Sequence, residues 1–172
     1  MSTANELLAD GFDRVHETVQ AAVEGLDEAT LAHRPDPEAN SVAWLVWHLA
    51  RVQDDHIAEV AGSEQLWTVG GWVERFGLPF EVGATGYGQS TEEVDRVRAG
   101  AELLAGYHEA VHRATVDYLR TLQDDDYARV VDERWDPPVT LGARLVSVLN
   151  DTTQHVGQAS YVRGLVERGA GG

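Results

Sequence analysis

The stretch Asn150-Asp-Thr-Thr-Gln-His-Val-Gly-Gln-Ala159 lies inside a run of residues with the apolar spacing of a helix. Residues on both sides of it recur every three or four positions and therefore share one helical face. Asp151 precedes His155 by four residues, so both side chains project toward that face. A helix that turns a carboxylate and an imidazole toward its own core needs a partner for them. The stripe comprises Leu141, Leu145, Val148, Thr152, His155, Ala159, Val162 and Val166.

Three further segments have helical periodicity. The first runs from about Ala4 to Leu26, and the second begins at a cap formed by Asn40 or Ser41 and fades near Gly62. The third follows Ser90-Thr91 and runs to about Leu122, and the fourth begins after Pro137-Pro138. Because strand signals are few, the sequence predicts an all-α fold, an up-and-down four-helix bundle formed by a single domain over residues 1–172.

Residues 63–90 form a long connection between the second and third predicted helices, rich in aromatic residues and glycine. Connections of this length are usually functional or disordered. This one is too aromatic for disorder, so we expect it to cover one end of the core, to wall a pocket, or both.

Composition excludes several classes of function. The net charge of -16 repels phosphate backbones and anionic lipid, so neither nucleic acid nor a membrane is an expected partner. No run of 18 apolar residues and no secretory signal pattern is visible, which predicts a cytoplasmic location. The chain has no Cys, so any thiol chemistry requires a thiol brought in from outside.

Asp151 and His155 are candidate metal ligands, and a third ligand must come from another helix. His48 is the best candidate because it shares a face with Leu45 and Val52 in the second helix. Three nitrogen and oxygen ligands leave a divalent ion with an open position, as in catalytic sites. Such a set suits Zn²⁺, and also Ni²⁺ or Fe²⁺. A buried histidine with ordinary hydrogen bonds is the alternative interpretation.

A second candidate metal site is His108-Glu-Ala-Val-His112, which matches the H-E-x-x-H pattern of metallopeptidases. No further ligand follows at a recognisable spacing, and the chain is short for a peptidase with a substrate cleft. The sequence therefore favours a core or pocket-lining role for His108 and partial exposure of His112.

The chain resembles the DinB superfamily, and within it the branch of mycothiol-dependent maleylpyruvate isomerase and the mycothiol S-transferases. The resemblance rests on four stretches in this order: Asn40-Ser-Val-Ala-Trp-Leu-Val-Trp-His-Leu-Ala-Arg-Val-Gln-Asp-Asp55, Leu66-Trp-Thr-Val-Gly-Gly-Trp-Val-Glu-Arg-Phe-Gly77, Gly86-Tyr-Gly-Gln89 and Asn150-Asp-Thr-Thr-Gln-His-Val-Gly-Gln158. It implies a four-helix bundle whose metal triad falls on His48, Asp151 and His155. Many relatives have His at the position of Asp151, and the isomerase branch has Glu, so this chain departs from both.

The resemblance also implies an activity. A divalent metal, with zinc expected first, would activate mycothiol for attack on a small-molecule electrophile. Two alternatives stay open: a non-catalytic metal-binding stress protein of the same fold, and a mycothiol-dependent isomerase. A monomer and a homodimer are both compatible with the sequence.

Further residues are candidates for substrate binding. Arg51 and Arg163 are expected to pair with a substrate carboxylate or with a surface carboxylate of the protein. Gly157 in mid-helix predicts the close approach of another helix or of substrate. The remaining candidates are Trp72, Phe76 and Tyr87 as pocket walls, His108 as a pocket-lining residue, and Gln158 as a hydrogen-bond partner of the ligands.

Overall fold

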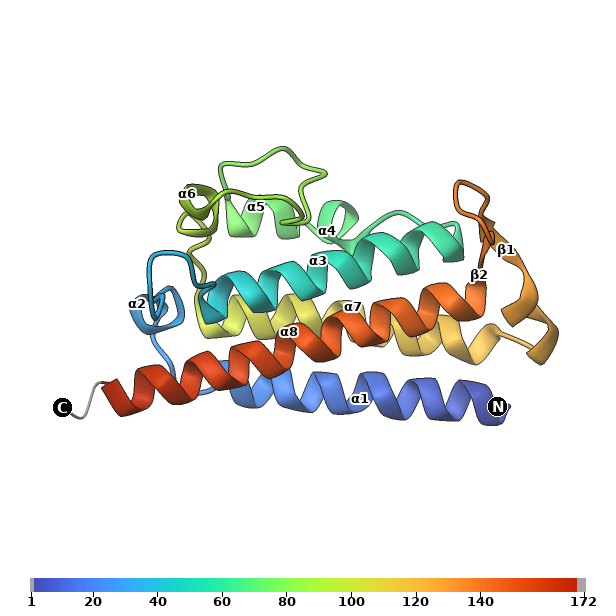
Figure 1. Ribbon diagram of the computed structural model, residues 1–172, viewed down its shortest axis with the longest axis horizontal. Coiled ribbons are helices and arrows are strands. Elements are labelled where there is room, and N and C mark those ends of the chain that lie inside the picture. The colour runs from blue at the N-terminus through green and yellow to red at the C-terminus, as the bar shows by residue number, and fades with distance from the viewer. Residues whose placement is uncertain (1, 170–172) are drawn as a thin grey trace.

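Figure 1 shows the computed structural model, which describes residues 2–169. Four long helices pack side by side over this range and form the predicted bundle. α1 and α3 occupy opposite corners, because each packs mainly on α7 and α8 and barely on the other. The four helices are α1 (Thr3–Val23), α3 (Val42–Ala61), α7 (Ala101–Thr121) and α8 (Leu141–Gly169).

The connectivity of the bundle differs from the up-and-down order predicted above. Arg51 of α3 bonds to Tyr107 of α7, and the Tyr118 hydroxyl, farther along α7, bonds to the Val60 carbonyl, farther along α3. These two helices are therefore parallel. The reason is that the connection between them runs back along the whole bundle (Figure 1). By contrast, α3 and α8 are antiparallel, since His48 meets His155 whereas His56 meets Arg144.

The apolar stripes predicted from the sequence form the core. Ser41 caps α3 by accepting a hydrogen bond from the Trp44 amide at 3.1 Å, and the helix ends at Gly62 in the left-handed conformation, φ +69°. Within the stripe of α8, His155 is only partly buried. Buried core residues include Phe12, Val15 and Val19 of α1, Leu45 and Leu49 of α3, Leu104 and Val111 of α7, and Leu141, Leu145 and Val148 of α8.

The predicted start of the third helix is wrong. Ser90 and Glu93 do form a reciprocal capping box, but it begins only the single turn α6 (Thr91–Val94). The chain then continues without regular structure to Gly100, which precedes α7. Val97 and Ala99 of this connecting segment are buried, and their burial explains why their apolar character looked helical in the sequence.

The long connection covers the core, as expected. It contains two short helices, α4 (Leu66–Val69) and α5 (Trp72–Phe76), whose aromatic side chains pack around Tyr107. The buried carboxylate of Asp54 accepts the amide hydrogens of Leu66 and Trp67 at 2.9 and 2.7 Å and thereby anchors the start of α4 to α3.

A small hairpin precedes α8 and was not predicted. Strand β1 (Val130–Asp132) pairs antiparallel with β2 (Val139–Thr140). Strands of three and two residues are too short to show the alternation that identifies a strand in sequence. A single turn, α2 (Glu28–Leu31), and a 3₁₀ turn, η1 (Asp124–Ala128), complete the elements of the described range. None of the helices described is long and apolar enough to cross a membrane.

Candidate metal centre

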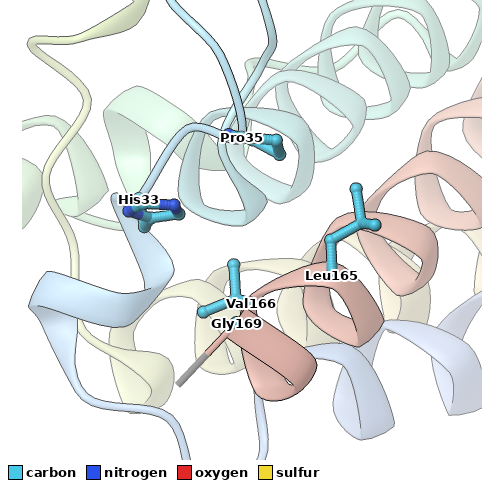
Figure 2. Close-up of a pocket in the computed structure, with 5 residues that line it drawn as sticks. All are labelled: His33, Pro35, Leu165, Val166 and Gly169. Atoms are coloured by element: carbon cyan, nitrogen blue, oxygen red, sulfur yellow. The ribbon is translucent and has the colours of Figure 1, made fainter. Parts of the chain in front are cut away.

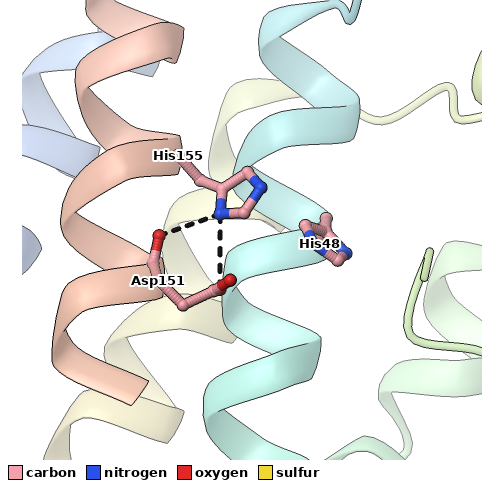
Figure 3. A group of neighbouring side chains, drawn as sticks. All are labelled: His48, Asp151 and His155. Atoms are coloured by element: carbon pink, nitrogen blue, oxygen red, sulfur yellow. Dashed lines mark hydrogen bonds and ion pairs between the residues drawn. The ribbon is translucent and has the colours of Figure 1, made fainter. Parts of the chain in front are cut away.

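Three side chains from two helices meet between α3 and α8. His48 of α3 and the pair Asp151 and His155 of α8 place one ligand atom each within 4.8 Å of the others. Figure 3 shows the two α8 side chains one turn apart, facing His48. The rings of His48 and His155 lie with centroids 4.6 Å apart at an angle of 75°. The structure thus brings together the three residues that the sequence selected.

A loop carbonyl orients His48. Its Nδ1 donates a hydrogen bond to the carbonyl oxygen of Thr85 at 2.5 Å, and its ring stacks on Trp44 at 4.5 Å. Because the carbonyl can only accept, Nδ1 carries the proton and Nε2 keeps its lone pair. Burial lowers the pKa of His48, although the bond to Thr85 acts in the opposite direction. The imidazole is therefore held neutral, in the state that a metal ligand requires.

The α8 pair is coupled internally. His155 Nδ1 donates to the backbone carbonyl of Asp151 at 2.8 Å and lies 3.3 Å from the carboxylate oxygen Oδ2. The contact with the Asp151 carboxylate raises the pKa of His155, against the effect of burial. Burial opposes ionisation of Asp151, but the contact with His155 and the charge of that ring outweigh it and lower the pKa of Asp151. Asp151 is therefore held as a carboxylate, and the raised pKa of His155 favours its imidazolium form. In the neutral ring, which a metal ion requires, the proton on Nδ1 leaves Nε2 free.

The donor set fits a divalent metal ion. Asp151 Oδ2 is buried and accepts no hydrogen bond among the described residues; His155 Nδ1, 3.3 Å away, donates to the backbone carbonyl of Asp151 instead. A buried polar atom without a partner calls for an explanation, and an ion is one. Two imidazoles and one carboxylate suit Zn²⁺, Ni²⁺ or Fe²⁺. Both imidazoles also have the backbone-bonded Nδ1 that typically fixes the orientation of a metal-binding histidine.

The sequence assigned the loop around Gly86 to a pocket wall, but it did not predict the contact of this loop with His48. Gly86 has φ +95°, and a Cβ atom at this position would lie 2.7 Å from His48 Nδ1. Only glycine allows the backbone to approach the imidazole so closely. Gly157 has nothing in the described chain within 4 Å of an added Cβ, so no neighbouring helix approaches it closely, and the approach of a substrate there stays a prediction. The glycine-rich composition of residues 83–88 was the available signal.

Arg51 is completely buried beside this loop. Its guanidinium donates to the carbonyl of Ala84 at 3.1 Å and to the Tyr107 hydroxyl at 3.3 Å, and it lies over the Trp67 ring. An ion pair with Asp54 at 3.7 Å balances its charge. These contacts favour a role in holding the loop over a role in binding a substrate carboxylate.

The other predicted pocket residues are scattered. Trp72 and Phe76 are buried in the cover over α7, whereas the side chain of Tyr87 is 93% exposed. Gln158 is exposed, and Arg163 bonds to Glu167 and to the carbonyls of Ala21 and Glu24 at the end of α1. The geometry does not join these side chains to the triad in one pocket.

The H-E-x-x-H residues face α1 and do not converge on a common point. His108 is fully buried, with its Nδ1 3.3 Å from Nδ1 of His16, and burial lowers its pKa to about 3. His112 bonds to Asp13 at 2.8 Å and stacks on His16. Over the described residues, the triad at His48 is the only group whose ligand atoms meet the spacing of a metal site. The geometry therefore does not favour the peptidase alternative.

A cavity of about 600 Å³ lies at the far end of α8, away from the triad (Figure 2). It is lined by Leu165, Val166 and Gly169 of α8 and by His33 and Pro35 of the connection before α3. Leu165 lies ten residues beyond His155, about 15 Å along the helix. This cavity includes no residue of the triad.

The protein is therefore a helical bundle in which two histidines and one aspartate lie close together between two helices. Comparison with known proteins agrees: the chain belongs to the mycothiol S-transferase family, whose model matches residues 7–168. A conserved protein from Enterococcus faecalis has 34% sequence identity and a TM-score of 0.90, with 96% of this chain and 98% of that chain covered. A DinB-like protein from Bacillus cereus has the same fold, with 21% identity, a TM-score of 0.59, and 96% and 92% covered. Among curated proteins, none matches this chain.

Proposed function

We propose that this protein is a metal-dependent S-transferase that joins the sulfur of mycothiol to an electrophilic carbon of a second small molecule. The observation that carries the proposal is the unpartnered carboxylate oxygen of Asp151 between two histidines whose Nε2 atoms are free. Membership of the mycothiol S-transferase family supports the choice of thiol. Zinc is the expected metal, with nickel or iron as alternatives.

His48, Asp151 and His155 would hold the metal ion. When bound, a divalent cation lowers the pKa of a coordinated thiol, which makes a nucleophilic thiolate available at neutral pH. The chain itself contributes orientation and charge: Thr85 holds the ring of His48, and Asp151 supplies a negative charge. Since the chain has no Cys, the attacking sulfur comes from the substrate. The reaction forms one carbon–sulfur bond, and the thiol proton leaves with the displaced group or is returned to the product of an addition.

Metal content provides the first test. Purified wild-type protein, His48→Ala and His112→Ala are analysed for metal after the same treatment. We expect His48→Ala to lose the metal and His112→Ala to keep it, because only His48 belongs to the triad. The reverse pattern would contradict the assigned site and return attention to the H-E-x-x-H residues.

Activity provides the second test. The metal-loaded protein is incubated with mycothiol and a fluorogenic electrophile, and the conjugate is identified by mass. A rate no faster than that of metal and thiol without protein would contradict S-transfer to that electrophile. An isomerase would instead return free mycothiol with a rearranged substrate. A metal-binding protein without thiol chemistry would gain no thermal stability from mycothiol.

A further inference from the structure

A cleft opens between the β1–β2 hairpin and the first turns of α8. Its volume is about 500 Å³, and its polar lining consists of His56, Asp132, Arg134, Arg144 and Ser147, with Trp135 at the edge. The hairpin lies at the end of the bundle where α3 ends and α8 begins (Figure 1). The cleft therefore adjoins the same pair of helices that carries the metal ligands.

The charges that line this cleft are paired with each other. Asp132 accepts from Arg134 at 2.8 Å and from Arg144 at 3.2 Å. Arg144 also donates to Nδ1 of His56 at 2.7 Å, and because a guanidinium cannot accept, the proton of the neutral imidazole lies on Nε2. The lining offers many hydrogen-bonding groups and has two arginines and one aspartate, and it is balanced in charge once Glu59, which lies outside it and accepts from Arg144 at 3.4 Å, is included. It suits a neutral ligand with several hydroxyl groups better than an anion.

Trp135 adds a flat apolar surface. Its side chain is 65% exposed although it is the largest side chain of the hairpin. An exposed aromatic ring beside convergent polar groups is a usual composition for a small-molecule site. Sugar rings match such a site because their C–H faces pack on an aromatic ring while their hydroxyls bond to polar side chains.

The cleft and the triad lie along one interface. The antiparallel helices α3 and α8 contact each other at both places. His56 meets Arg144 at the cleft, and His48 meets His155 at the triad. Ser147 in the cleft is one helical turn from Asp151. Arg144 is seven residues from Asp151, which corresponds to about 10 Å along α8. A ligand in the cleft would have to extend about 10 Å along this interface to reach Asp151.

We infer that this cleft binds the sugar portion of the thiol substrate, while its sulfur reaches the triad. The inference rests on the proposed function. Mycothiol is N-acetylcysteine joined through an amide to a neutral glucosamine–inositol unit, so it combines a thiol arm with a polyhydroxylated end. The charge-balanced lining, the exposed Trp135 and the distance to Asp151 fit these two parts.

The test compares two thiols on the metal-loaded protein. Mycothiol has the sugar unit, and N-acetylcysteinamide has the same thiol arm without it. The variants are Trp135→Ala, the conservative Trp135→Phe, and Tyr161→Ala as a matched control, since Tyr161 is an exposed aromatic residue of α8 outside the cleft lining.

For Trp135→Ala we expect the KM for mycothiol to rise by about five- to tenfold, in line with the loss of one aromatic contact. The kcat for mycothiol and the rate with N-acetylcysteinamide should stay unchanged, Trp135→Phe should restore most of the affinity, and Tyr161→Ala should match wild type. Equal effects on both thiols, or no effect on either, would overturn the inference and leave the proposed function intact. A wild-type protein inactive with mycothiol would overturn the proposed function itself.

Direct binding gives a second measurement that does not depend on turnover. Glucosaminyl-inositol, which has the sugar unit and no thiol, is titrated into metal-free protein while the amide and indole signals are followed by NMR. We expect shifts at Trp135, Arg144 and Ser147 that disappear in Trp135→Ala. Shifts located elsewhere, or saturation that is unchanged in the variant, would place the sugar at a different site and overturn the inference.

Discussion

Nδ1 of His48 lies 2.5 Å from the carbonyl oxygen of Thr85, so the loop between α5 and α6 sets the orientation of a ligand on α3. Arg51 donates a hydrogen bond to the carbonyl of Ala84 and thereby holds the same loop in place. The metal centre therefore depends on a segment far from it in the sequence, through backbone contacts that do not depend on the side chains of the loop.

Gly86→Ala should weaken metal binding. The added methyl group would lie 2.7 Å from His48 Nδ1, which would displace the imidazole or break its bond to Thr85. Gly88→Ala is the matched control, because Gly88 also has a positive φ but nothing within 4 Å of an added Cβ. Both variants have backbone strain, and only the first has the clash. We expect zinc affinity, measured by competition with a chelator, to fall about 10- to 100-fold in Gly86→Ala alone.

Tyr107→Phe should destabilise the cover over α7. The hydroxyl donates to Asp54 at 2.8 Å and accepts from Arg51 at 3.3 Å, and all three side chains are buried. Its removal takes one buried hydrogen bond from Asp54 and one from Arg51, at a cost of about 1 to 3 kcal/mol in the free energy of unfolding. Urea denaturation of this variant and of Tyr161→Phe, whose ring is exposed, measures the difference. An equal loss of unfolding free energy in the two variants would contradict a stabilising role for the buried hydrogen bonds of Tyr107.

His108 should make the protein less stable in acid. Burial and the nearby charges of His16 and His112 lower its pKa from 6.5 to about 3, so the folded state keeps it neutral while the unfolded state protonates it. The unfolded state then binds more protons between pH 6.5 and 3, and stability falls as the pH falls through this range. At pH 4.5 the contribution is about 2 to 3 kcal/mol.

The variant His108→Leu tests this directly. The free energy of unfolding at pH 7.5 minus that at pH 4.5 should be smaller in His108→Leu than in wild type, since leucine does not titrate. His33→Leu is the control, because His33 is exposed. An unchanged pH dependence in His108→Leu would show that other groups govern the acid response.

Asp151→Asn should remove most of the stabilisation that zinc provides. An amide is a neutral and weaker ligand than a carboxylate, and the unpartnered Oδ2 is the oxygen placed nearest His155. A metal that binds only the folded state stabilises it by an amount that grows with the logarithm of the ratio of metal concentration to Kd, so a weaker site gives a smaller rise in melting temperature. Thermal unfolding with and without zinc measures this for wild type, Asp151→Asn and Asp117→Asn, an exposed aspartate of α7. A zinc-dependent shift that survives in Asp151→Asn would contradict the triad.

The helices and the candidate metal ligands could be predicted because their signals are local. Apolar spacing identifies one face of each helix, and the interval between Asp151 and His155 is a helical repeat, so the four long helices and the pair on α8 follow from the sequence. The apolar spacing of its helix placed His48 on the inward face, but it did not show which helix would pack against that face. The start of α7 was misplaced because the capping box at Ser90 begins only the short helix α6, and buried Val97 lies seven residues before Leu104, as in a helical stripe.

What the sequence by itself determined is the chemistry of the donors: two imidazoles, one carboxylate and no thiol of its own. The tertiary structure decided where those donors and their supports lie. It made α3 and α7 parallel by running the connection back along the bundle, buried Arg51 beneath the loop, and brought Gly86 against His48. The physical reason is that periodicity records which residues are apolar along one element, whereas these contacts join segments tens of residues apart. Only the packing of the whole chain brings such segments together.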